Sequence, residues 1–126
     1  MSTGSPGGRL VLECRLEQGI PVVRVGGEVD VSTSGELRSS LLAAVSTKAS
    51  QSLVVNLADV QFIDSTGIGV LVGLWRRIRA GNGRLVLAAP SSQVRRTLDT
   101  AGLTEVLPCY ELESEAVHGA SPHLER

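Results

Sequence analysis

The run Asp64-Ser65-Thr66-Gly67-Ile68-Gly69 holds the side chains of this sequence that are best placed to do chemistry. A serine at the start of a helix accepts a hydrogen bond from a free backbone N–H group, and we expect Ser65 to cap a helix in this way, bonded to Gly67 or Ile68. The glycines have no Cβ atom, so they let an anion or another backbone come close. A purely structural role, in which they allow tight packing of a helix on a sheet, explains the same pattern.

Ser65 lacks the neighbours that catalysis would need. The two histidines, His118 and His123, lie in a stretch that we expect to be a C-terminal tail, so no general base is evident. A nucleophile elbow requires a glycine where Ile63 stands, and a dinucleotide fingerprint requires one where Val72 stands. The phosphate-binding pattern G-x-x-x-x-G-K-[ST] does not occur either. We therefore expect a protein that is not an enzyme.

The composition is that of one ordinary globular domain. The chain has 126 residues, 42% of them hydrophobic and 20% charged, and its formal net charge of −1 gives no electrostatic reason to bind nucleic acid. No apolar stretch reaches the roughly 18 to 20 residues of a membrane span. The first residues do not resemble a secretory signal, so a cytoplasmic location is the default expectation. Cys14 and Cys109 form no C-x-x-C pair and have no histidine cluster beside them, so we expect two core cysteines, no metal site and no cofactor.

The elements that must position Ser65 are a strand before it and a helix after it. Leu53–Leu57 is apolar at nearly every position, as expected for a buried strand. Ile68–Ile78 has apolar residues at the i, i+3, i+4, i+7 spacing of a helix that faces a core, and the arginines at 76, 77 and 79 lie off that stripe. These patterns predict a set of largely buried side chains: Phe62, Leu71, Trp75 and Leu98.

The N-terminal part of the chain predicts a hairpin and a helix. Arg9–Leu16 alternates with a period of two, which places Leu10, Leu12, Cys14 and Leu16 inward, and the short gap before Val22–Val25 favours an antiparallel hairpin. Thr33-Ser34-Gly35-Glu36 then matches the capping box that opens a helix.

The C-terminal part predicts a further strand and a further helix. Leu85–Ala89 is a buried type of strand, and Ser91 or Ser92 can cap a helix that ends before Gly102. Thr104–Tyr110 could supply a short strand, which Pro108 would confine to a sheet edge. Glu111–Val117 could add one or two helical turns.

Strands that alternate with helices from Val22 onward imply right-handed crossovers and a mostly parallel sheet. The antiparallel hairpin at the start makes this sheet mixed. The sequence thus predicts one α/β domain of four to five strands over residues 9–117, with flexible tails at residues 1–8 and 118–126.

Four segments of the sequence carry a resemblance to a known family: Gly27–Asp30, Leu53–Leu57, Phe62–Leu71 and Ala101–Leu103. In their order and content they resemble the STAS-domain anti-sigma-factor antagonists, bacterial proteins that free a sigma factor by binding its anti-sigma factor. The similarity extends from Leu10 to Leu112, and the segment around Asp64–Gly69 is its most specific part. The resemblance implies helices packed largely on one side of the sheet.

The resemblance also implies a mechanism and a set of site residues. It implies that the unphosphorylated protein binds an anti-sigma factor with serine kinase activity, which resembles the ATP-binding domain of histidine kinases. Phosphorylation of Ser65 by that kinase switches binding off, and a separate serine phosphatase reverses the modification. The resemblance places Asp64 beside this serine and Asp30 near the recognition surface. The Gly27–Asp30 turn and the capped helix start leave the same edge of the sheet at strand C-terminal ends, where α/β proteins tend to bind, so we expect these residues to lie together. The residues assigned to partner binding are Asp30, Ser32, Asp64, Thr66 and Gly67.

Two other readings stay open from the sequence. Other STAS proteins serve as scaffold subunits of sensory complexes or lipid transporters, and in such a protein Ser65 would be only a helix cap. A third reading is a small-ligand binder that uses the turn from Gly67 to Gly69.

Overall fold

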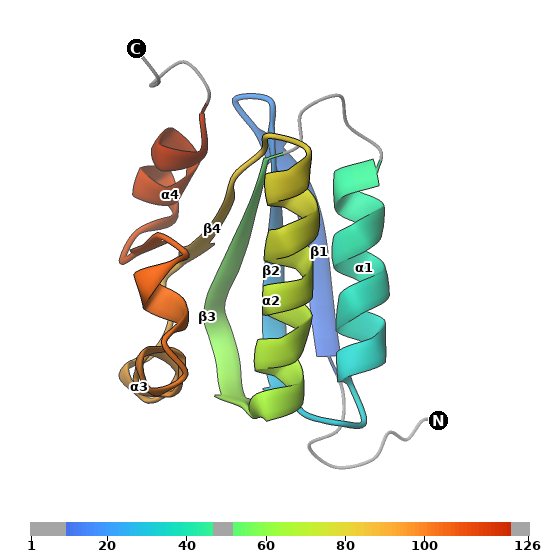
Figure 1. The fold of residues 1–126 in the computed structure, drawn as a ribbon, viewed down its shortest axis with the longest axis vertical. Coiled ribbons are helices and arrows are strands. Elements are labelled where there is room, and N and C mark those ends of the chain that lie inside the picture. The colour runs from blue at the N-terminus through green and yellow to red at the C-terminus, as the bar shows by residue number, and fades with distance from the viewer. Residues whose placement is uncertain (1–9, 47–51, 122–126) are drawn as a thin grey trace.

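The computed structural model describes residues 10–46 and 52–121, and a five-stranded mixed sheet lies at its centre (Figure 1). The strand order follows the chain, with β1 antiparallel to β2 and all later neighbours parallel. The strands are β1 (Leu10–Glu17), β2 (Ile20–Val29), β3 (Leu53–Ile63), β4 (Leu85–Ala88) and β5 (Cys109–Tyr110). The helices are α1 (Ser34–Ser46), α2 (Ser65–Ala80), α3 (Ser92–Thr100), the short 3-10 helix η1 (Leu103–Glu105) and α4 (Glu113–Ala120).

The predicted hairpin is confirmed, and its turn has a simple cause. Glu17 pairs with Ile20, so only Gln18 and Gly19 form the connection. Both have left-handed backbone angles, with φ of 56° and 83°. A two-residue turn of this kind matches the right-handed twist of the two strands.

Side chains from the two faces of the sheet form two separate cores. On one face, α1, α2 and α3 pack against alternate residues of the strands, such as Val23 and Val55. On the other face, Ala116, Val117 and Ala120 of α4 pack against the residues one position away, such as Val54. The period of two along each strand thus separates the cores, and most helices lie on one side of the sheet, as the resemblance implied.

The prediction that a C-terminal tail begins at residue 118 is wrong. The structure continues α4 to Ala120, and this residue is fully buried against the sheet. Its spacing of four from Ala116 brings both alanines to the same helix face, which is the reason why the helix extends through His118 and Gly119. The tail expected at residues 1–8, and the part of the C-terminal tail at 122–126, fall outside the described residues.

Several burial predictions need correction. Phe62 is 42% exposed because the pairing of β3 with β2 shifts by one residue between Val60 and Phe62, and this irregularity lets both Val60 and Ile63 point inward while Phe62 points outward. Cys14 is exposed and Leu16 is 49% exposed, because β1 is an edge strand whose contact with the core ends at Leu12.

Other burial predictions are confirmed wholly or in part. Leu71 and Leu98 are buried at 1% and 0% exposure. Trp75 and Cys109 are only partly buried, although both pack against the larger core. None of the helices within residues 10–46 and 52–121 is long and apolar enough to cross a membrane.

Candidate functional site

Two turns meet at the carboxyl ends of β2 and β3, where the sequence placed the candidate residues. Val29 and Ile63 are paired in the parallel ladder, and the backbone N–H of Asp64 donates to the carbonyl oxygen of Val29 at 3.0 Å. Asp30 follows Val29 and Asp64 follows Ile63, so the two carboxylates leave neighbouring strands at the same edge. The predicted proximity of Asp30 and Asp64 is confirmed, and it follows from parallel strands ending side by side.

The cap of α2 is Asp64, and the prediction that Ser65 caps this helix is wrong. Asp64 has extended backbone angles, and its Oδ1 accepts hydrogen bonds from Thr66 N at 2.9 Å and Gly67 N at 3.2 Å. The Thr66 hydroxyl donates to the same oxygen at 2.6 Å. A carboxylate satisfies the free N–H groups of the first turn and also complements the positive end of the helix dipole. The helix therefore begins one residue before the position that the sequence suggested.

Ser65 becomes the first residue of α2 as a result, and its side chain is exposed. Its hydroxyl makes no hydrogen bond to any part of the chain that the structure describes. Thr66, by contrast, is tied to Asp64 through its hydroxyl. Of the two neighbouring hydroxyls, that of Ser65 is therefore the one open to solvent.

Asp30 organises the second turn. Its Oδ1 accepts hydrogen bonds from the backbone N–H of Ser32 at 2.9 Å and from the Ser32 hydroxyl at 2.7 Å. Thr33 lies beneath them, 1% exposed, where its hydroxyl donates to the Glu28 carbonyl at 2.8 Å and accepts from Asp30 N at 3.0 Å. The Thr33 hydroxyl thus holds the strand end instead of forming the predicted capping box with Glu36. Ser32 is exposed beside the carboxylate.

Both carboxylates are stabilised in their charged form. The pKa of Asp30 is lowered chiefly by hydrogen bonds from Ser32, and the pKa of Asp64 is lowered chiefly by the hydroxyl of Thr66, with help from the N–H groups of the helix start. The charge of the neighbouring Asp30 acts in the opposite direction on Asp64 and raises its pKa, to a smaller extent. Near neutral pH this edge therefore carries two negative charges around Ser65.

Gly67 has a structural role that its position in the motif does not reveal. It is buried, and a Cβ built on it would lie 2.5 Å from Val29 Cγ1 and 2.7 Å from Ile63 Cγ1. The absence of a side chain lets the first turn of α2 rest directly on the ends of β2 and β3. Gly69 differs, because it is exposed and has no atom within 4 Å of a Cβ built there. Tight packing thus explains Gly67 and leaves Gly69 unexplained.

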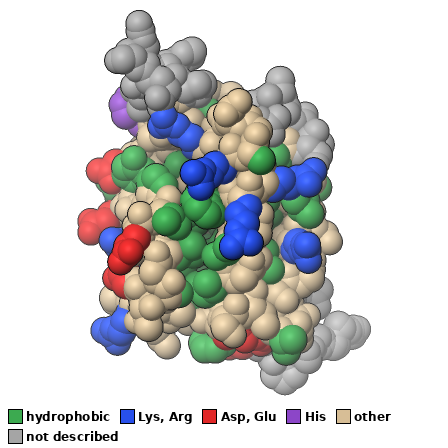
Figure 2. All heavy atoms as spheres, in the orientation of Figure 1, with side chains coloured by type: hydrophobic (Ala, Val, Ile, Leu, Met, Phe, Trp, Pro, Cys, Tyr) green, Lys and Arg blue, Asp and Glu red, His purple; other side chains and the backbone are tan. Residues whose placement is uncertain are grey.

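Two exposed apolar side chains lie close to the carboxylates in the sequence. Neither was predicted to be on the surface. Val31 is 77% exposed next to Asp30, and Phe62 is 42% exposed two residues before Asp64. Figure 2 shows green hydrophobic side chains on either side of a red acidic patch at the lower edge of the molecule. The sequence feature that could have indicated an exposed Val31 is its position between the polar turn residues Asp30 and Ser32. We call the edge formed by Asp30, Val31, Ser32, Phe62, Asp64, Ser65 and Thr66 the switch rim.

No group of three or more His, Cys, Asp or Glu side chains within the described residues could hold a metal ion. The switch rim supports recognition by charge and shape, and it leaves the Ser65 oxygen accessible from solvent.

Comparisons with known proteins agree with this fold. Residues 12–116 match the family model described as the STAS domain. The sequence is 32% identical over 108 residues to the anti-sigma F factor antagonist of Paenibacillus polymyxa, which covers 86% of this chain and 92% of the relative. The fold is similar to the crystal structure of an anti-sigma factor antagonist from Mycobacterium paratuberculosis, with a TM-score of 0.83 and 25% identity over 92% of this chain and 97% of the other.

A second structural likeness concerns a protein solved in two chemical states. The unphosphorylated form of the anti-sigma factor antagonist SpoIIAA matches with a TM-score of 0.73 and 26% identity, over 86% of this chain and 95% of the other. The phosphorylated form of the Bacillus SpoIIAA matches with a TM-score of 0.67 and 25% identity, over 88% of this chain and 100% of the other.

Proposed function

Because this chain belongs to the STAS-domain anti-sigma-factor antagonist family, we propose that it binds an anti-sigma factor and thereby releases a sigma factor. The unphosphorylated protein binds, and a phosphate on Ser65 switches binding off. The anti-sigma factor is itself the serine kinase, and a separate serine phosphatase restores the binding form. The protein is a binding partner and kinase substrate instead of an enzyme, and it acts in the cytoplasm with the sigma factor.

The observation that carries this proposal is the state of Ser65. Its hydroxyl is exposed and free of hydrogen bonds among the described residues, while Asp64 caps the helix in its place. A kinase can therefore use the oxygen without breaking a cap or opening the core. The existence of SpoIIAA in phosphorylated and unphosphorylated forms supports the same conclusion for this fold.

The switch rim offers the partner both charge and apolar contacts. Asp30 and Asp64 supply negative charge, Ser32 and Thr66 supply hydroxyls beside it, and Val31 supplies exposed apolar surface. We expect the anti-sigma factor to place basic residues opposite the two carboxylates, because interfaces are complementary in charge, and an apolar patch opposite Val31. Gly67 contributes indirectly, because it seats the first turn of α2 and so sets the position of Ser65.

Phosphorylation acts on this contact surface and leaves the fold nearly unchanged. A phosphate adds about −1.5 to −2 charge at pH 7, and the start of a helix favours a negative charge by about 0.3 to 1 kcal/mol. The charges of Asp30 and Asp64 oppose it, so the net effect on the free protein is small. At a closed interface the same added charge is desolvated and faces two carboxylates, which costs several kcal/mol.

The first experiment tests the modification. The protein is incubated with Mg-ATP and the anti-sigma factor of its own organism, and intact mass is measured. We expect one added phosphate in wild type and none in Ser65→Ala. Ser92→Ala is the matched control, because Ser92 is also an exposed first residue of a helix, and it should be phosphorylated like wild type. A phosphate that persists in Ser65→Ala would place the site elsewhere.

The second experiment tests binding by calorimetry. Ser65→Ala should bind the anti-sigma factor like wild type, whereas Ser65→Asp and Asp30→Lys should bind more weakly. Ser92→Asp adds the same charge to the start of α3 and should leave binding unchanged. If Ser65→Asp binds as tightly as wild type and no phosphate is added, the scaffold reading replaces the switch.

The third experiment tests where the switch acts. Amide chemical shifts are compared between the free phosphorylated and unphosphorylated proteins. We expect changes confined to the switch rim and the first turn of α2. Large changes across the central strands would show that phosphorylation alters the fold instead of the surface.

A further inference from the structure

A second surface feature, the groove between α1 and α2, adjoins the switch rim at Thr66 and extends away from it along the two helices. The two helices run side by side on the same face of the sheet (Figure 1), and a groove of about 460 Å³ separates their outer faces. Apolar side chains line it, namely Leu41, Leu42, Val70 and Leu74. Ser34 and Thr66 close the end nearest the switch rim.

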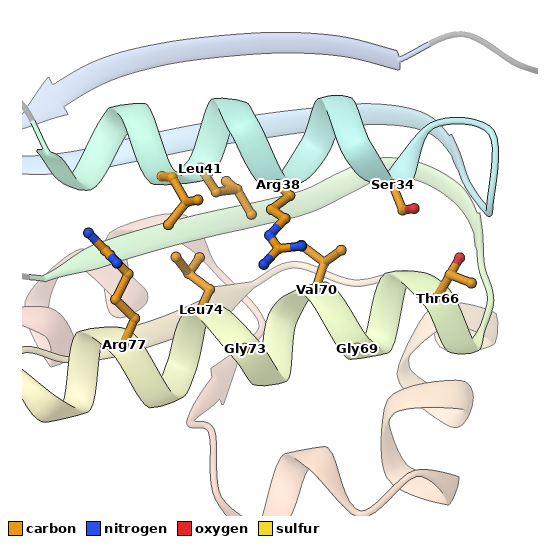
Figure 3. A pocket seen from close by; sticks show the side chains of 10 residues that line it. Ser34, Arg38, Leu41, Thr66, Gly69, Val70, Gly73, Leu74 and Arg77 are labelled. Carbon is orange, nitrogen blue, oxygen red and sulfur yellow. The ribbon is translucent and has the colours of Figure 1, made fainter.

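Two arginines reach into this groove from opposite sides. Figure 3 shows the side chain of Arg38 directed from α1 toward α2, and that of Arg77 directed from α2 toward α1. Neither forms an ion pair or hydrogen bond within the part of the chain that the structure describes. By contrast, Arg24 is paired with Asp59 at 2.9 Å and Arg95 with Asp99 at 3.4 Å. Among the described residues, the lining of the groove therefore carries two positive charges and no carboxylate.

The wall of the groove that α2 forms is open because of two glycines. Gly69 and Gly73 both line it, lie four residues apart on one face of the helix, and have no atom within 4 Å of a Cβ built on either. Glycine is unfavourable inside a helix, so these positions lower helix stability without serving the core as Gly67 does. What they provide is room for another backbone to approach α2 closely.

The spacing of the charges indicates the shape of the ligand. In Figure 3 Arg38 reaches the level of Val70, and Arg77 lies seven residues further along α2. Seven residues correspond to about 10 Å along a helix axis. An α-helix with acidic residues seven positions apart, and apolar residues three and four positions after the first acid, presents two carboxylates at that distance with an apolar contact between them.

We propose that this groove binds an acidic amphipathic helix of a protein partner. The carboxylates of that helix pair with Arg38 and Arg77, its apolar side chains cover the partly exposed Leu42 and Val70, and its backbone approaches at Gly69 and Gly73. Charge complementarity favours this occupant, because Figure 2 shows basic side chains interleaved with hydrophobic ones over the face that α1 and α2 form. This is the helix-in-groove mode of recognition. It does not depend on the proposed function, since the groove residues are distinct from Ser65 and its carboxylates.

The test uses a synthetic helical peptide of roughly fourteen residues with the spacing given above, and the full chain labelled with nitrogen-15. Addition of the peptide should shift amide signals of residues 34–42 and 66–77. Arg38→Glu and Arg77→Glu should each weaken binding by at least about tenfold, because each replaces an attraction with a repulsion. Arg76→Glu is the matched control: it makes the same charge change on α2 outside the groove lining and should bind as wild type does.

A variant that fills the groove with an apolar side chain tests the proposal without changing any charge. Gly73→Leu places a side chain in the groove where nothing obstructs it, so it should fold normally by circular dichroism and lose the peptide. The proposal is overturned if a peptide with lysines in place of its acids binds equally well, or if inorganic phosphate alone reproduces the shifts. It is also overturned if Gly73→Leu binds the peptide as wild type does. No anti-sigma factor is present, so failure of the switch would leave this result unaffected.

Discussion

The three glycines of α2 provide the sharpest test of how the switch rim is supported. Each of Gly67, Gly69 and Gly73 is replaced by alanine in turn. In a helix, alanine is favoured over glycine by about 1 kcal/mol, and this gain is available at all three positions to a similar extent. The positions differ only in what the added methyl group meets.

At Gly67 the methyl group would lie 2.5 Å from Val29 Cγ1 and 2.7 Å from Ile63 Cγ1. Both neighbours are buried, β-branched side chains of strand ends, so neither can rotate away without disturbing the core. Overpacking of this kind costs about 1 to 3 kcal/mol. At Gly69 and Gly73 the methyl group meets nothing within 4 Å, so the helix gain remains in full.

We therefore expect Gly67→Ala to be less stable than Gly73→Ala by about 1 to 3 kcal/mol, the overpacking term alone. Gly69→Ala and Gly73→Ala should both be more stable than wild type. The assay is urea unfolding followed by circular dichroism, with all four proteins compared at one pH and one protein concentration. If Gly67→Ala is as stable as Gly73→Ala, the first turn of α2 does not rest on β2 and β3 as described, and the argument for the position of Ser65 fails.

Three further predictions follow from single side chains. Leu71→Ala should cost about 2 to 5 kcal/mol in urea unfolding through the cavity it leaves, since Leu71 is 1% exposed, and a loss below about 1 kcal/mol would remove it from the core. Asp64→Ala should cost about 1 kcal/mol at pH 7 through loss of the cap. The pKa of Asp64 is lowered in the folded state, so this stabilisation is present above the ordinary aspartate pKa of about 3.9 and should disappear as the pH falls through the lower folded value. If Asp64→Ala costs the same free energy of unfolding at every pH, the charged Asp64 is not the cap of α2. With a thiol reagent, exposed Cys14 should react before Cys109, whose pKa is raised by burial, and the reverse order would contradict the placement of β1 at the sheet edge.

Local patterns in the sequence determined much of this fold. The alternation in β1 and β2, the apolar run of β3 and the stripe of α2 each depend on residues within one element, and the structure confirms each element with different end points. The placement of Asp30 and Asp64 at one edge also followed, because parallel strands joined by right-handed crossovers bring their carboxyl ends together.

Only the tertiary structure decided which side chains the solvent reaches. Phe62 and Cys14 were both expected to be buried, yet both are exposed: a register shift between β2 and β3 turns Phe62 outward, and Cys14 lies on an edge strand beyond the part that packs against the core. The length of α4 was decided in the same way, by its alanines packing on the far face of the sheet.

The arrangement of the switch rim and that of the groove were also decided only by the tertiary structure. Asp64 and Ser65 are both good caps by type, and only the backbone angles at the end of β3 assign the cap to the carboxylate and leave the hydroxyl free. Arg38 and Arg77 are 39 positions apart in the sequence. Only the packing of α1 beside α2 brings them to one groove, because contacts between distant segments depend on how whole elements pack and leave no local pattern in the chain.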